Sequence, residues 1–406
     1  MAKLPDEFIQ LTRQLMGDER FNRYLQSFEE EAPVSIRLNP AKRIEVSGKR
    51  LEVSDGEPVP WCRNGYYLKQ RPNFTMDPLF HAGCYYVQEA ASMFLDEVLR
   101  QITQKEPSLL CNSALDLCAA PGGKSTLLRA ALPDDCVLYS NEPVRQRASI
   151  LLENVTKWGY PDHYVTNAYP KDYHKARMTF DLILCDVPCS GEGMFRKDPA
   201  TISEWSPQQV EKCQLLQRDI VSDAWACLNG GGLLIYSTCT FNIKENEENI
   251  RWMLSTLDDA EVIPVETRPE WNITGSLLDG FNEPVYRFIP GISRGEGLFM
   301  CVLRKRGERL EVRGKRNALT ILSPLISHLS PLKTELTYQQ AIAYLRGEAL
   351  RLPDDTPRGE VTVTFMGHAL GPVKNIGSRA NNLYPKPWRI KTTHIPNNYE
   401  AILRYT

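Results

Sequence analysis

The sequence predicts an α/β protein built around a mostly parallel β-sheet that helices cover on both faces. Between residues 85 and 304, short apolar runs typical of buried strands alternate with stretches of helical periodicity. Such alternation is typical of right-handed βαβ units. The blocks on either side each mix a helix with short strands, and 406 residues exceed what one core usually organises. We therefore expect a central domain with a smaller α+β segment at each end.

The boundaries of these segments lie where the pattern changes. They give an N-terminal segment at 1–84, a core at 85–304, a linker at 305–332 and a C-terminal segment at 333–406. The first segment opens with apolar residues at helical spacing: Phe8, Leu11, Leu15, Met16, Phe21, Leu25 and Phe28.

Strands and helices are then assigned in chain order. In the N-terminal segment, a strand over 35–39 stops at a proline, which cannot donate to a sheet, and 66–68 is a second candidate. Core strands are predicted at 114–117, 137–140, 182–185, 232–236 and 298–303, with helices after Lys124 and Arg145 and over 208–228 and 245–257. The C-terminal segment has a predicted helix at 338–346 and strands at 362–365 and 370–374.

Charge is distributed unevenly along the chain. From Arg304 onward there are 17 Lys and Arg against 8 Asp and Glu, whereas the whole chain carries a net charge of only −2. This asymmetry indicates a basic C-terminal appendage that meets an anionic partner. A solvated basic surface is the alternative.

Composition excludes several classes of protein. Hydrophobic residues make up 42% of the chain, yet no run of about 18 apolar residues predicts a membrane span. The start of the chain lacks an apolar leader, so we expect a cytoplasmic protein. Eleven cysteines with no C-x-x-C pair indicate free thiols in a reducing compartment and no structural zinc. A cysteine with a role here would therefore serve chemistry, and we expect no metal.

A turn of small residues follows the first core strand. In Ala114-Leu-Asp-Leu-Cys-Ala-Ala-Pro-Gly-Gly-Lys-Ser125, an apolar strand runs into a glycine turn that opens a helix. Small residues let the backbone approach a ligand closely, and ligands bind at this edge of an open α/β sheet. The pattern matches neither G-x-G-x-x-G nor a phosphate-binding P-loop. Glu142 follows the next strand, 19 residues beyond Gly123, at a distance that suits a ribose diol, so we expect an adenosine-type cofactor.

Two cysteines follow the ends of two other predicted strands. Cys189 and Asp186 come after strand 182–185, and Cys239 comes after strand 232–236. Since parallel strands end at one edge of the sheet, both thiols and the carboxylate should meet at the cofactor turn. Most free cysteines are small buried residues, but these two follow their apolar runs in polar loops.

Thiols and a carboxylate beside a methyl donor suit methylation of a pyrimidine carbon. Carbon 5 of cytosine is a weak nucleophile until a thiolate adds to carbon 6 and converts the ring to an enamine. A carboxylic acid that protonates or hydrogen-bonds ring N3 eases this addition. A base must then remove the carbon 5 proton as the thiol leaves.

These strings together resemble the Sun-type family of RNA cytosine-5 methyltransferases. The resemblance rests on Leu115-Asp-Leu-Cys-Ala-Ala-Pro-Gly-Gly-Lys-Ser125, Asp186-Val-Pro-Cys-Ser-Gly191, Ser237-Thr-Cys-Thr-Phe241, Glu245-Asn-Glu-Glu248, Tyr86-Val-Gln-Glu-Ala-Ala-Ser92 and Gly295-Glu-Gly-Leu-Phe-Met300. Gly191-Glu-Gly-Met-Phe-Arg-Lys-Asp198 is similar to the RsmF/YebU branch, which acts on bacterial small-subunit ribosomal RNA. Ser35-Ile-Arg-Leu-Asn39, Gly371-Pro-Val-Lys374 and Tyr384-Pro-Lys-Pro-Trp388 are similar to its N-terminal segment and its PUA-like RNA-binding appendage.

The resemblance implies a Rossmann-like core that depends on S-adenosylmethionine, and a role for each matching residue. Cys239 is the implied nucleophile, Cys189 helps to resolve the adduct, and Asp186 hydrogen-bonds the cytosine at N3 and at its amino group. The implied cofactor-binding residues are Cys118, Ala119, Ala120, Pro121, Gly122, Gly123, Lys124, Glu142, Asn167 and Asp186.

Two of these positions carry separate expectations. Asn167 stands where the family usually has Asp, and its side-chain carbonyl can still accept from an adenine amino group. Lys124 is expected to pair with Asp186 or to lie near the cytosine carbonyl, where a cation also lowers a thiol pKa; a solvent-exposed lysine is the alternative.

RNA must present the target base unstacked, because the reacting atoms are hidden in a helix. Candidate RNA contacts, which combine basic and aromatic side chains, are Arg196, Lys197, Trp205, Tyr384, Trp388, Arg389 and Lys391. Trp205 fits a core position equally well. Transfer RNA in place of ribosomal RNA, or a non-catalytic RNA-binding assembly factor, stays open as an alternative, and we expect a monomer.

Overall fold

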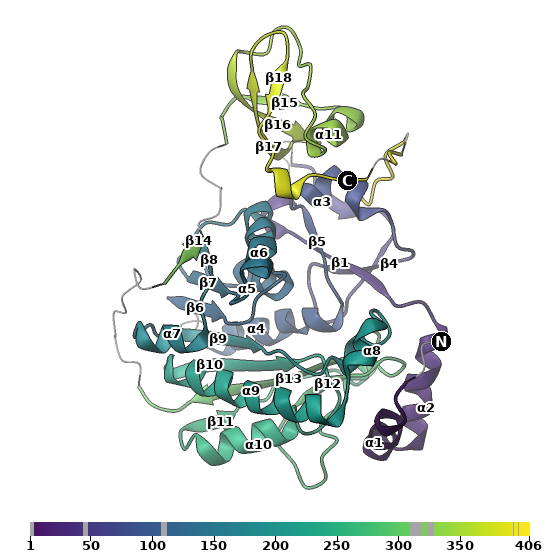
Figure 1. The fold of residues 1–406 in the computed structure, drawn as a ribbon, viewed down its shortest axis with the longest axis vertical. Coiled ribbons are helices and arrows are strands. Elements are labelled where there is room, and N and C mark those ends of the chain that lie inside the picture. Colours follow the sequence, from purple (N-terminus) through teal and green to yellow (C-terminus); the bar gives the residue numbers. More distant parts are fainter. Residues whose placement is uncertain are drawn as a thin grey trace.

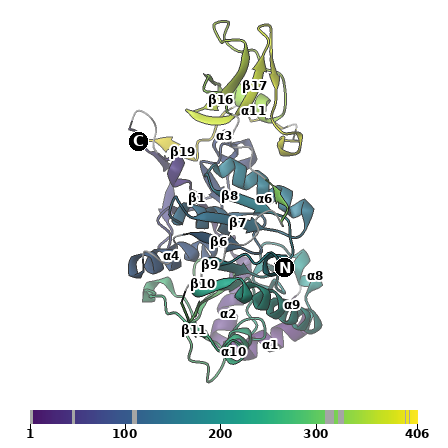
Figure 2. The same cartoon turned by 90° about the vertical axis from the view of Figure 1, so that its left-hand side faces the viewer.

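The computed structural model describes residues 4–43, 48–106, 112–308, 319–322, 329–392, 394–396 and 398–406. A central sheet with its helices forms the body of the molecule, and the C-terminal segment stands at one end of it (Figure 1). Helices α1 (Asp6–Met16) and α2 (Asp18–Gln26) lie at the opposite end, which the view turned by 90° confirms (Figure 2).

The central sheet has the order β11-β13-β10-β9-β6-β7-β8-β14, with β12 paired to β13, within the described part of the chain. Its strands are β6 (Ser113–Asp116), β7 (Val137–Asn141), β8 (His163–Thr166), β9 (Phe180–Asp186), β10 (Leu228–Thr238), β11 (Ala260–Val262), β12 (Tyr286–Phe288), β13 (Leu298–Lys305) and β14 (Ile321–Leu322). Strands β10, β9, β6, β7 and β8 run parallel. The predicted α/β class with a parallel core is therefore confirmed.

Alternate residues of the parallel strands supply two separate cores. Leu182 and Leu184 of β9 pack on one face with α4 (Phe94–Lys105) and α5 (Gly123–Ala131). Ile183 and Cys185 pack on the other face with α7 (Pro170–Lys175), α9 (Pro207–Ala226) and α10 (Glu247–Thr256). This alternation is what the period of two in a strand requires when helices cover both faces. Helix α6 (Arg145–Trp158) covers the β8 end through Leu151 and Val155.

The predicted strand at 298–303 is present as β13, but it runs antiparallel to β10. Strand β12 pairs with β13 in the same antiparallel sense, and a loop without a crossover helix joins them. A parallel neighbour needs a long crossover connection, whereas an antiparallel one does not. The sheet is thus parallel at its centre and antiparallel at this edge.

The N-terminal segment forms a small sheet of order β3-β4-β1-β5. Its elements are β1 (Val34–Leu38), β2 (Leu51–Val53), β3 (Gly56–Pro58), β4 (Gly65–Leu68), α3 (Pro78–His81) and β5 (Tyr85–Val87). The two predicted strands at 35–39 and 66–68 correspond to β1 and β4. Helices α1 and α2 do not join this sheet, because Phe8, Phe21 and Tyr24 pack instead against Phe195, Trp205, Phe241 and other core residues near α8 (Ala200–Glu204).

The C-terminal segment forms a sheet of order β15-β16-β17-β18 with one helix against it. Its elements are β15 (Lys333–Glu335), α11 (Tyr338–Leu345), β16 (Gly359–Phe365), β17 (His368–Asn375), β18 (Ala380–Asn382) and β19 (Leu403–Tyr405). Strand β19 is not part of this sheet. It pairs antiparallel with β2, where Tyr405 lies opposite Leu51. The N- and C-terminal segments consequently share one hydrophobic core.

No helix among the described residues is long and apolar enough to cross a bilayer.

Arg37 of β1 joins the N-terminal segment to the central domain. The side chain is buried; its Nε donates to Gln88 Oε1 at 2.7 Å and its Nη2 donates to Thr126 Oγ1 at 2.6 Å and to the Gly123 carbonyl at 3.2 Å. The guanidinium also lies 4.5 Å above the Trp158 ring. Since Gly123 and Thr126 belong to the first turn of α5, the N-terminal segment directly supports the start of that helix.

Replacing Arg37 should therefore destabilise the protein. We expect Arg37→Ala to lower the free energy of unfolding by about 3 kcal/mol, because three buried hydrogen bonds to a charged donor are lost and their acceptors stay buried. Urea unfolding measures this change. The control is Arg13→Ala, whose exposed pair with Asp18 should contribute less than about 1 kcal/mol. Equal effects of the two substitutions would contradict the assignment.

Candidate active site

The small-residue turn after β6 has the conformation that the sequence predicts. Gly122 takes φ 114°, in the left-handed region, and directly precedes α5. A Cβ at Gly122 would lie 3.1 Å from Leu151 Cδ1, so a side chain there meets both strain and crowding. Glycine thus lets the turn fold closely over the first residues of α5, whose free N–H groups face outward from the helix start.

Two polar residues follow the neighbouring strands at this same edge. Glu142 follows β7 and is buried; its Oε1 accepts from the Val144 N–H at 2.9 Å and its Oε2 lies 3.2 Å from Arg147 Nη1. Asn167 follows β8, and its Nδ2 donates to the carbonyls of Glu142 and Pro143 at 2.7 and 2.9 Å. With its nitrogen turned to these carbonyls, the Asn167 side chain presents its oxygen as a hydrogen-bond acceptor.

Lys124 and Asp186 form the ion pair that the sequence analysis expects. Lys124 Nζ lies 2.8 Å from Asp186 Oδ2, and the Lys124 side chain is only 13% exposed. Burial alone would lower the pKa of Lys124, but the charge and hydrogen bond of Asp186, with smaller contributions from Cys239 and Asp116, raise the pKa above its usual value. A permanent cation therefore stands at the ends of β6 and β9.

The two predicted thiols meet beside this ion pair. Cys189 Sγ lies 3.1 Å from Cys239 Sγ, and the Cys239 N–H donates to Cys189 Sγ at 3.4 Å. The register places Ser237 of β10 opposite Asp186 of β9, so the loops that follow both strands begin side by side. Both cysteines are half-buried, as is Cys118, whereas Cys185, Cys136 and Cys227 are buried in the core.

The surroundings of Cys189 favour its protonated form. The hydrogen bond with Cys239 is the largest cause that raises the pKa of Cys189 well above its usual value, followed by burial and by the charges of Cys239 and Glu245. A protonated Cys189 can then donate to Cys239 Sγ.

Two buried carboxylates fix the loops that carry the thiols. Glu245 accepts from the Ser190 N–H at 3.0 Å, from Gln217 Nε2 at 2.7 Å and from Asn242 Nδ2 at 2.8 Å. Glu192 accepts from the Phe241 N–H at 2.7 Å, so it bridges the Cys189 loop to the Cys239 loop. These bonds hold both sulfur atoms at a set separation, because the donors Ser190, Phe241 and Asn242 belong to the two loops and Gln217 belongs to α9.

A close backbone contact supports the same geometry. The Gly193 N–H donates to the Cys239 carbonyl at 2.8 Å, and a Cβ at Gly193 would lie 2.7 Å from that oxygen. Only glycine allows the two loops to touch at this point.

Some predicted RNA contacts are wrong. Arg196 is turned inward, where it pairs with Glu296 at 2.8 Å and donates to the Ser27 carbonyl, and Trp205 is a core residue that donates to Glu192. Helices α1 and α2 cover both residues, and the sequence did not show that these helices dock there. Tyr384 is buried in the core shared by the terminal segments. Lys197 and Lys391 are exposed, while Trp388 and Arg389 are half-buried.

Sequence reasoning also missed several supporting residues. Arg37, Gln88, Glu192 and Glu245 were part of matching strings but received no role. The sequence did contain a signal for them. Each is a charged or amide residue in an otherwise apolar or small-residue string, and such a side chain needs hydrogen-bond partners when it is buried. Groups of three or more His, Cys, Asp and Glu that would suit a metal do not occur in the described ranges.

The sheet and its carboxyl-edge site define a Rossmann-like methyltransferase core, and comparison with known proteins identifies its kind. The family described as 16S rRNA methyltransferase RsmB/F matches residues 110–304, the N-terminal domain of 16S rRNA methyltransferase RsmF matches 4–90, and the methyltransferase RsmF PUA domain matches 331–390. A methyltransferase homolog from Pyrococcus horikoshii has a similar structure, with a TM-score of 0.57 and 26% identity over 74% of this chain and all of that one.

Two curated relatives are both named ribosomal RNA small subunit methyltransferase F. The one from Pectobacterium atrosepticum is 30% identical over 96% of this chain and 81% of its own length. The one from Pectobacterium carotovorum is 33% identical over 75% of this chain, which spans only 63% of that relative. The chain belongs to the ribosomal RNA small subunit methyltransferase F family, and the resemblance to the RsmF branch of the Sun-type family is confirmed.

The distance between the two sulfur atoms predicts that a mild thiol oxidant will cross-link them. A disulfide requires the sulfur atoms to close from 3.1 Å by about 1 Å, which loop side chains can do. Each event oxidises two thiols and reduces the oxidant by two electrons. The oxidised, denatured chain should show nine titratable thiols in place of eleven. Cys189→Ala should retain all ten of its thiols, and loss of two there would contradict the pairing.

Asp116, at the end of β6, should make stability depend on pH. Burial, reinforced by the charge of Asp186, raises the pKa of the Asp116 carboxyl to about 7. Between pH about 4 and about 7 the folded chain thus binds more protons here than the unfolded chain, so stability falls as the pH rises. We expect about 2 kcal/mol of this fall, measured by urea unfolding, to vanish in Asp116→Asn. An unchanged slope would contradict the assignment.

Proposed function

We propose that this chain transfers a methyl group from S-adenosylmethionine to carbon 5 of a cytosine in small-subunit ribosomal RNA, through a covalent Cys239 adduct that Cys189 helps to resolve. The observation that carries the proposal is the 3.1 Å contact between the two sulfur atoms at the edge that also holds Lys124, Asp186 and the glycine turn. Methyl transfer to nitrogen or oxygen needs no thiol, so the pair favours attack on a carbon.

The turn and its surroundings fit S-adenosylmethionine. Gln88 Nε2 is buried and has no hydrogen-bond partner in the described structure, and the side chain lies 3.6 Å from where a Gly123 Cβ would be. A buried amide without a partner costs free energy unless a ligand completes it. Together with the glycine turn and the buried Glu142 carboxylate, it suits a ligand that has both a carboxylate and a ribose.

The proposed cofactor contacts follow the chain around the sheet edge. Residues 118–124 would wrap the ligand, Glu142 would accept from the ribose hydroxyls, and Asn167 Oδ1 would accept from the adenine amino group. S-adenosylmethionine supplies a methyl group on a positively charged sulfur, which a nucleophilic carbon can take. Asp186 lies between this turn and the two thiols, in reach of both ligands.

Cys239 starts the reaction on the base. Its thiolate forms a bond to carbon 6 of cytosine, and carbon 5 gains the electron density that it needs to accept the methyl group. Asp186 Oδ1 accepts from the 4-amino group, while Lys124 neutralises the carboxylate and offers protons near N3 and the ring carbonyl. The Lys124–Asp186 pair would therefore orient the ring and stabilise the charge that the attack pushes into it.

Cys189 acts at the end of the reaction. The carbon 5 proton passes to water, the Cys239–carbon 6 bond breaks, and Cys189 gives its proton to the departing Cys239 sulfur. When Cys239 is bonded to carbon 6, its hydrogen bond and negative charge no longer raise the pKa of Cys189, although burial and Glu245 still do. Cys189 is therefore a stronger acid at the stage at which its proton is needed.

The substrate part of the proposal rests on the relatives and on charge. Both curated relatives described above carry names that specify the small ribosomal subunit, and the chain from Arg304 onward is basic. Counterion release from RNA phosphates favours binding to such a surface. Within this proposal, segments 1–84 and 333–406 bind RNA on either side of the catalytic core at 85–304, and 305–332 links the last two.

Cys189→Ala should trap the reaction. Incubated with S-adenosylmethionine and small-subunit RNA, this variant should accumulate a protein–RNA adduct that survives denaturation, because the departing sulfur has lost its proton donor. Gel electrophoresis with labelled RNA measures the adduct. Cys189→Ala/Cys239→Ala should form none, and Cys213→Ala, which removes a thiol of α9, should turn over like the wild type.

The outcomes separate the alternatives. Methylation by wild type without any trapped adduct in Cys189→Ala would remove Cys189 from the release step. Methylation of bulk tRNA in preference to small subunits or naked ribosomal RNA would replace the substrate. Tight RNA binding without methylation of any of these RNAs would favour a non-catalytic assembly factor.

A further inference from the structure

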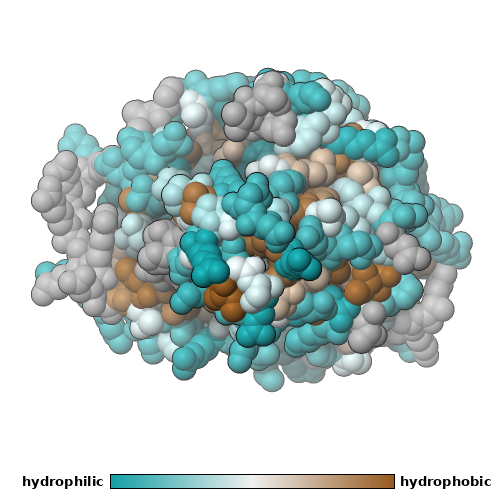
Figure 3. All heavy atoms as spheres, turned by 90° about the horizontal axis from the view of Figure 1, so that it is seen from above, coloured by the Kyte–Doolittle hydropathy of each residue, from teal (hydrophilic) through white to brown (hydrophobic). Residues whose placement is uncertain are grey.

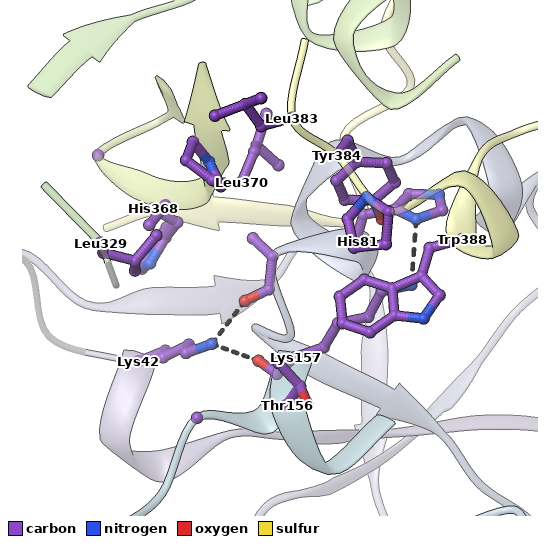
Figure 4. Close-up of a pocket in the computed structure, with 17 residues that line it drawn as sticks. Lys42, His81, Thr156, Lys157, Leu329, His368, Leu370, Leu383, Tyr384 and Trp388 are labelled. Carbon is purple, nitrogen blue, oxygen red and sulfur yellow. Dashed lines mark hydrogen bonds between the residues drawn. The ribbon is translucent and has the colours of Figure 1, made fainter. Parts of the chain in front are cut away.

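A cavity of about 410 Å³ lies where three parts of the chain meet, and neither Cys189 nor Cys239 lines it. Figure 4 shows the residues around it. Lys42 and His81 come from the N-terminal segment, Thr156 and Lys157 from the end of α6, and residues 367–372 and 383–388 from the C-terminal segment. Leu370 and Leu383 lie on one side of the cavity in Figure 4, and Lys42 and Thr156 lie on the other.

The walls of this cavity are held in place by packing on both sides. The terminal segments share a hydrophobic core, and β19 pairs with β2. Tyr338 Oη donates to the Met76 carbonyl at 3.1 Å, and Tyr399 Oη donates to Asp77 Oδ1 at 3.0 Å. A cavity between walls fixed in this way is already formed before a ligand arrives, which lowers the entropy cost of binding.

The lining combines aromatic and cationic groups. Trp388 is half-buried, and Lys157 Nζ lies 5.8 Å from the centre of its ring. Among the seventeen lining residues there are two lysines and two histidines but no aspartate or glutamate. Burial is the main cause that lowers the pKa of His81, to about 3, so this histidine is neutral. Lys157 Nζ forms an ion pair with Glu153, a residue outside this lining, at 2.5 Å. The cavity is thus apolar, and Lys42 supplies the positive charge at its edge.

Lys42 adds a half-buried ammonium group that forms no ion pair with any of the residues the structure describes. Its Nζ donates to the carbonyls of Ala82 and Lys157, both at 2.6 Å, at the C-terminal ends of α3 and α6. Two of the three N–H groups of the ammonium are engaged, and both acceptors are neutral. An anionic ligand at this cavity would supply the charge that the protein itself does not.

We propose that this cavity binds an unstacked nucleotide of the RNA substrate, with the base against Trp388 and the phosphate toward Lys42. A volume of about 410 Å³ suits a small ligand of nucleotide size, and aromatic side chains are the usual platforms for single-stranded bases. This inference rests on the proposed function, because it concerns how the same RNA is held. Seen from the end that carries the C-terminal segment, the surface has small hydrophobic patches among hydrophilic side chains (Figure 3).

Helix α6 connects the cavity to the proposed cofactor site. Helix α6 carries Arg147, which reaches Glu142 and the Ala120 carbonyl, near its start and Lys157 at its end, and 14 residues span about 20 Å. Asn154 Nδ2 of the same helix donates to the Pro121 carbonyl at 2.8 Å, so α6 contacts the proposed cofactor turn along its length and ends at the cavity. A nucleotide held in the cavity would fix which cytosine of the strand reaches Cys239.

The test is cross-linking and affinity with small-subunit ribosomal RNA, without S-adenosylmethionine. Ultraviolet cross-linking followed by peptide mapping should place a link within residues 383–388. Trp388→Ala should weaken RNA binding between about five- and a hundredfold, as expected when one base loses its aromatic platform, whereas Trp388→Phe should retain most of the affinity. Trp252→Ala is the matched control, since Trp252 is a half-buried tryptophan on α10 at the other end of the molecule.

A second pair of variants controls for effects of the substitution on folding. Leu383 at the cavity and Leu332 outside it are 43% and 45% exposed, so a charge should be tolerated equally at both. Leu383→Glu should reduce affinity at least about fivefold, because it brings a carboxylate to a cavity that has none, and Leu332→Glu should not. Identical affinity of both variants and of wild type, with no cross-link at 383–388, would overturn the proposal and leave the cavity to a non-RNA ligand.

Failure of the two proposals can be told apart. Methylation by wild type with unchanged affinity in Trp388→Ala overturns the nucleotide pocket alone. A cross-link at 383–388 that Leu383→Glu abolishes, without methylation of the RNA, supports the pocket and overturns the proposed reaction alone.

Discussion

The site depends on one constraint, the register in which β9 and β10 pair. Because Ser237 lies opposite Asp186, the two strands end together and their loops leave the sheet side by side. A shift by one residue would turn every side chain of one strand to the other face and separate Cys189 from Cys239. The apolar residues of both strands, buried alternately in two cores, prevent that shift. Hydrophobic burial that has no part in chemistry thus sets the separation of the reacting groups.

Buried polar groups then fix the positions of the loops that follow the strands. Glu192 and Glu245 each accept several hydrogen bonds from the thiol loops, so their burial is compensated and the loops are tied to each other. Arg37 performs a comparable task at the other side of the site, where it holds the first turn of α5 against the N-terminal segment. The N-terminal segment is therefore part of the architecture that shapes the core.

Local pattern was enough to predict β6, β7, β9 and β10, the glycine turn, and the meeting of Cys189, Cys239, Asp186 and Lys124, because topology alone brings strand ends to one edge. It did not predict the parallel strand β8. It failed where the answer depended on distant docking. Arg196 was predicted to contact RNA, but α1 and α2 cover it, and for Trp205 the same docking decides in favour of the core alternative. Strand β13 fitted the pattern of a core strand, but nothing in its residues gave its direction. The core shared by the terminal segments had no local signal, since its partners are hundreds of residues apart.

The pairing of β19 with β2 has a consequence for folding during translation. About 350 residues separate the two strands, and at 5–20 residues per second a ribosome needs about 20 to 70 seconds to translate that distance. During this interval, Leu51 and the apolar residues around it lack the partners that cover them in the finished molecule. The N-terminal segment leaves the ribosome before the C-terminal segment that covers its apolar residues has been synthesised. A chaperone that shields this apolar surface would therefore favour productive folding over aggregation.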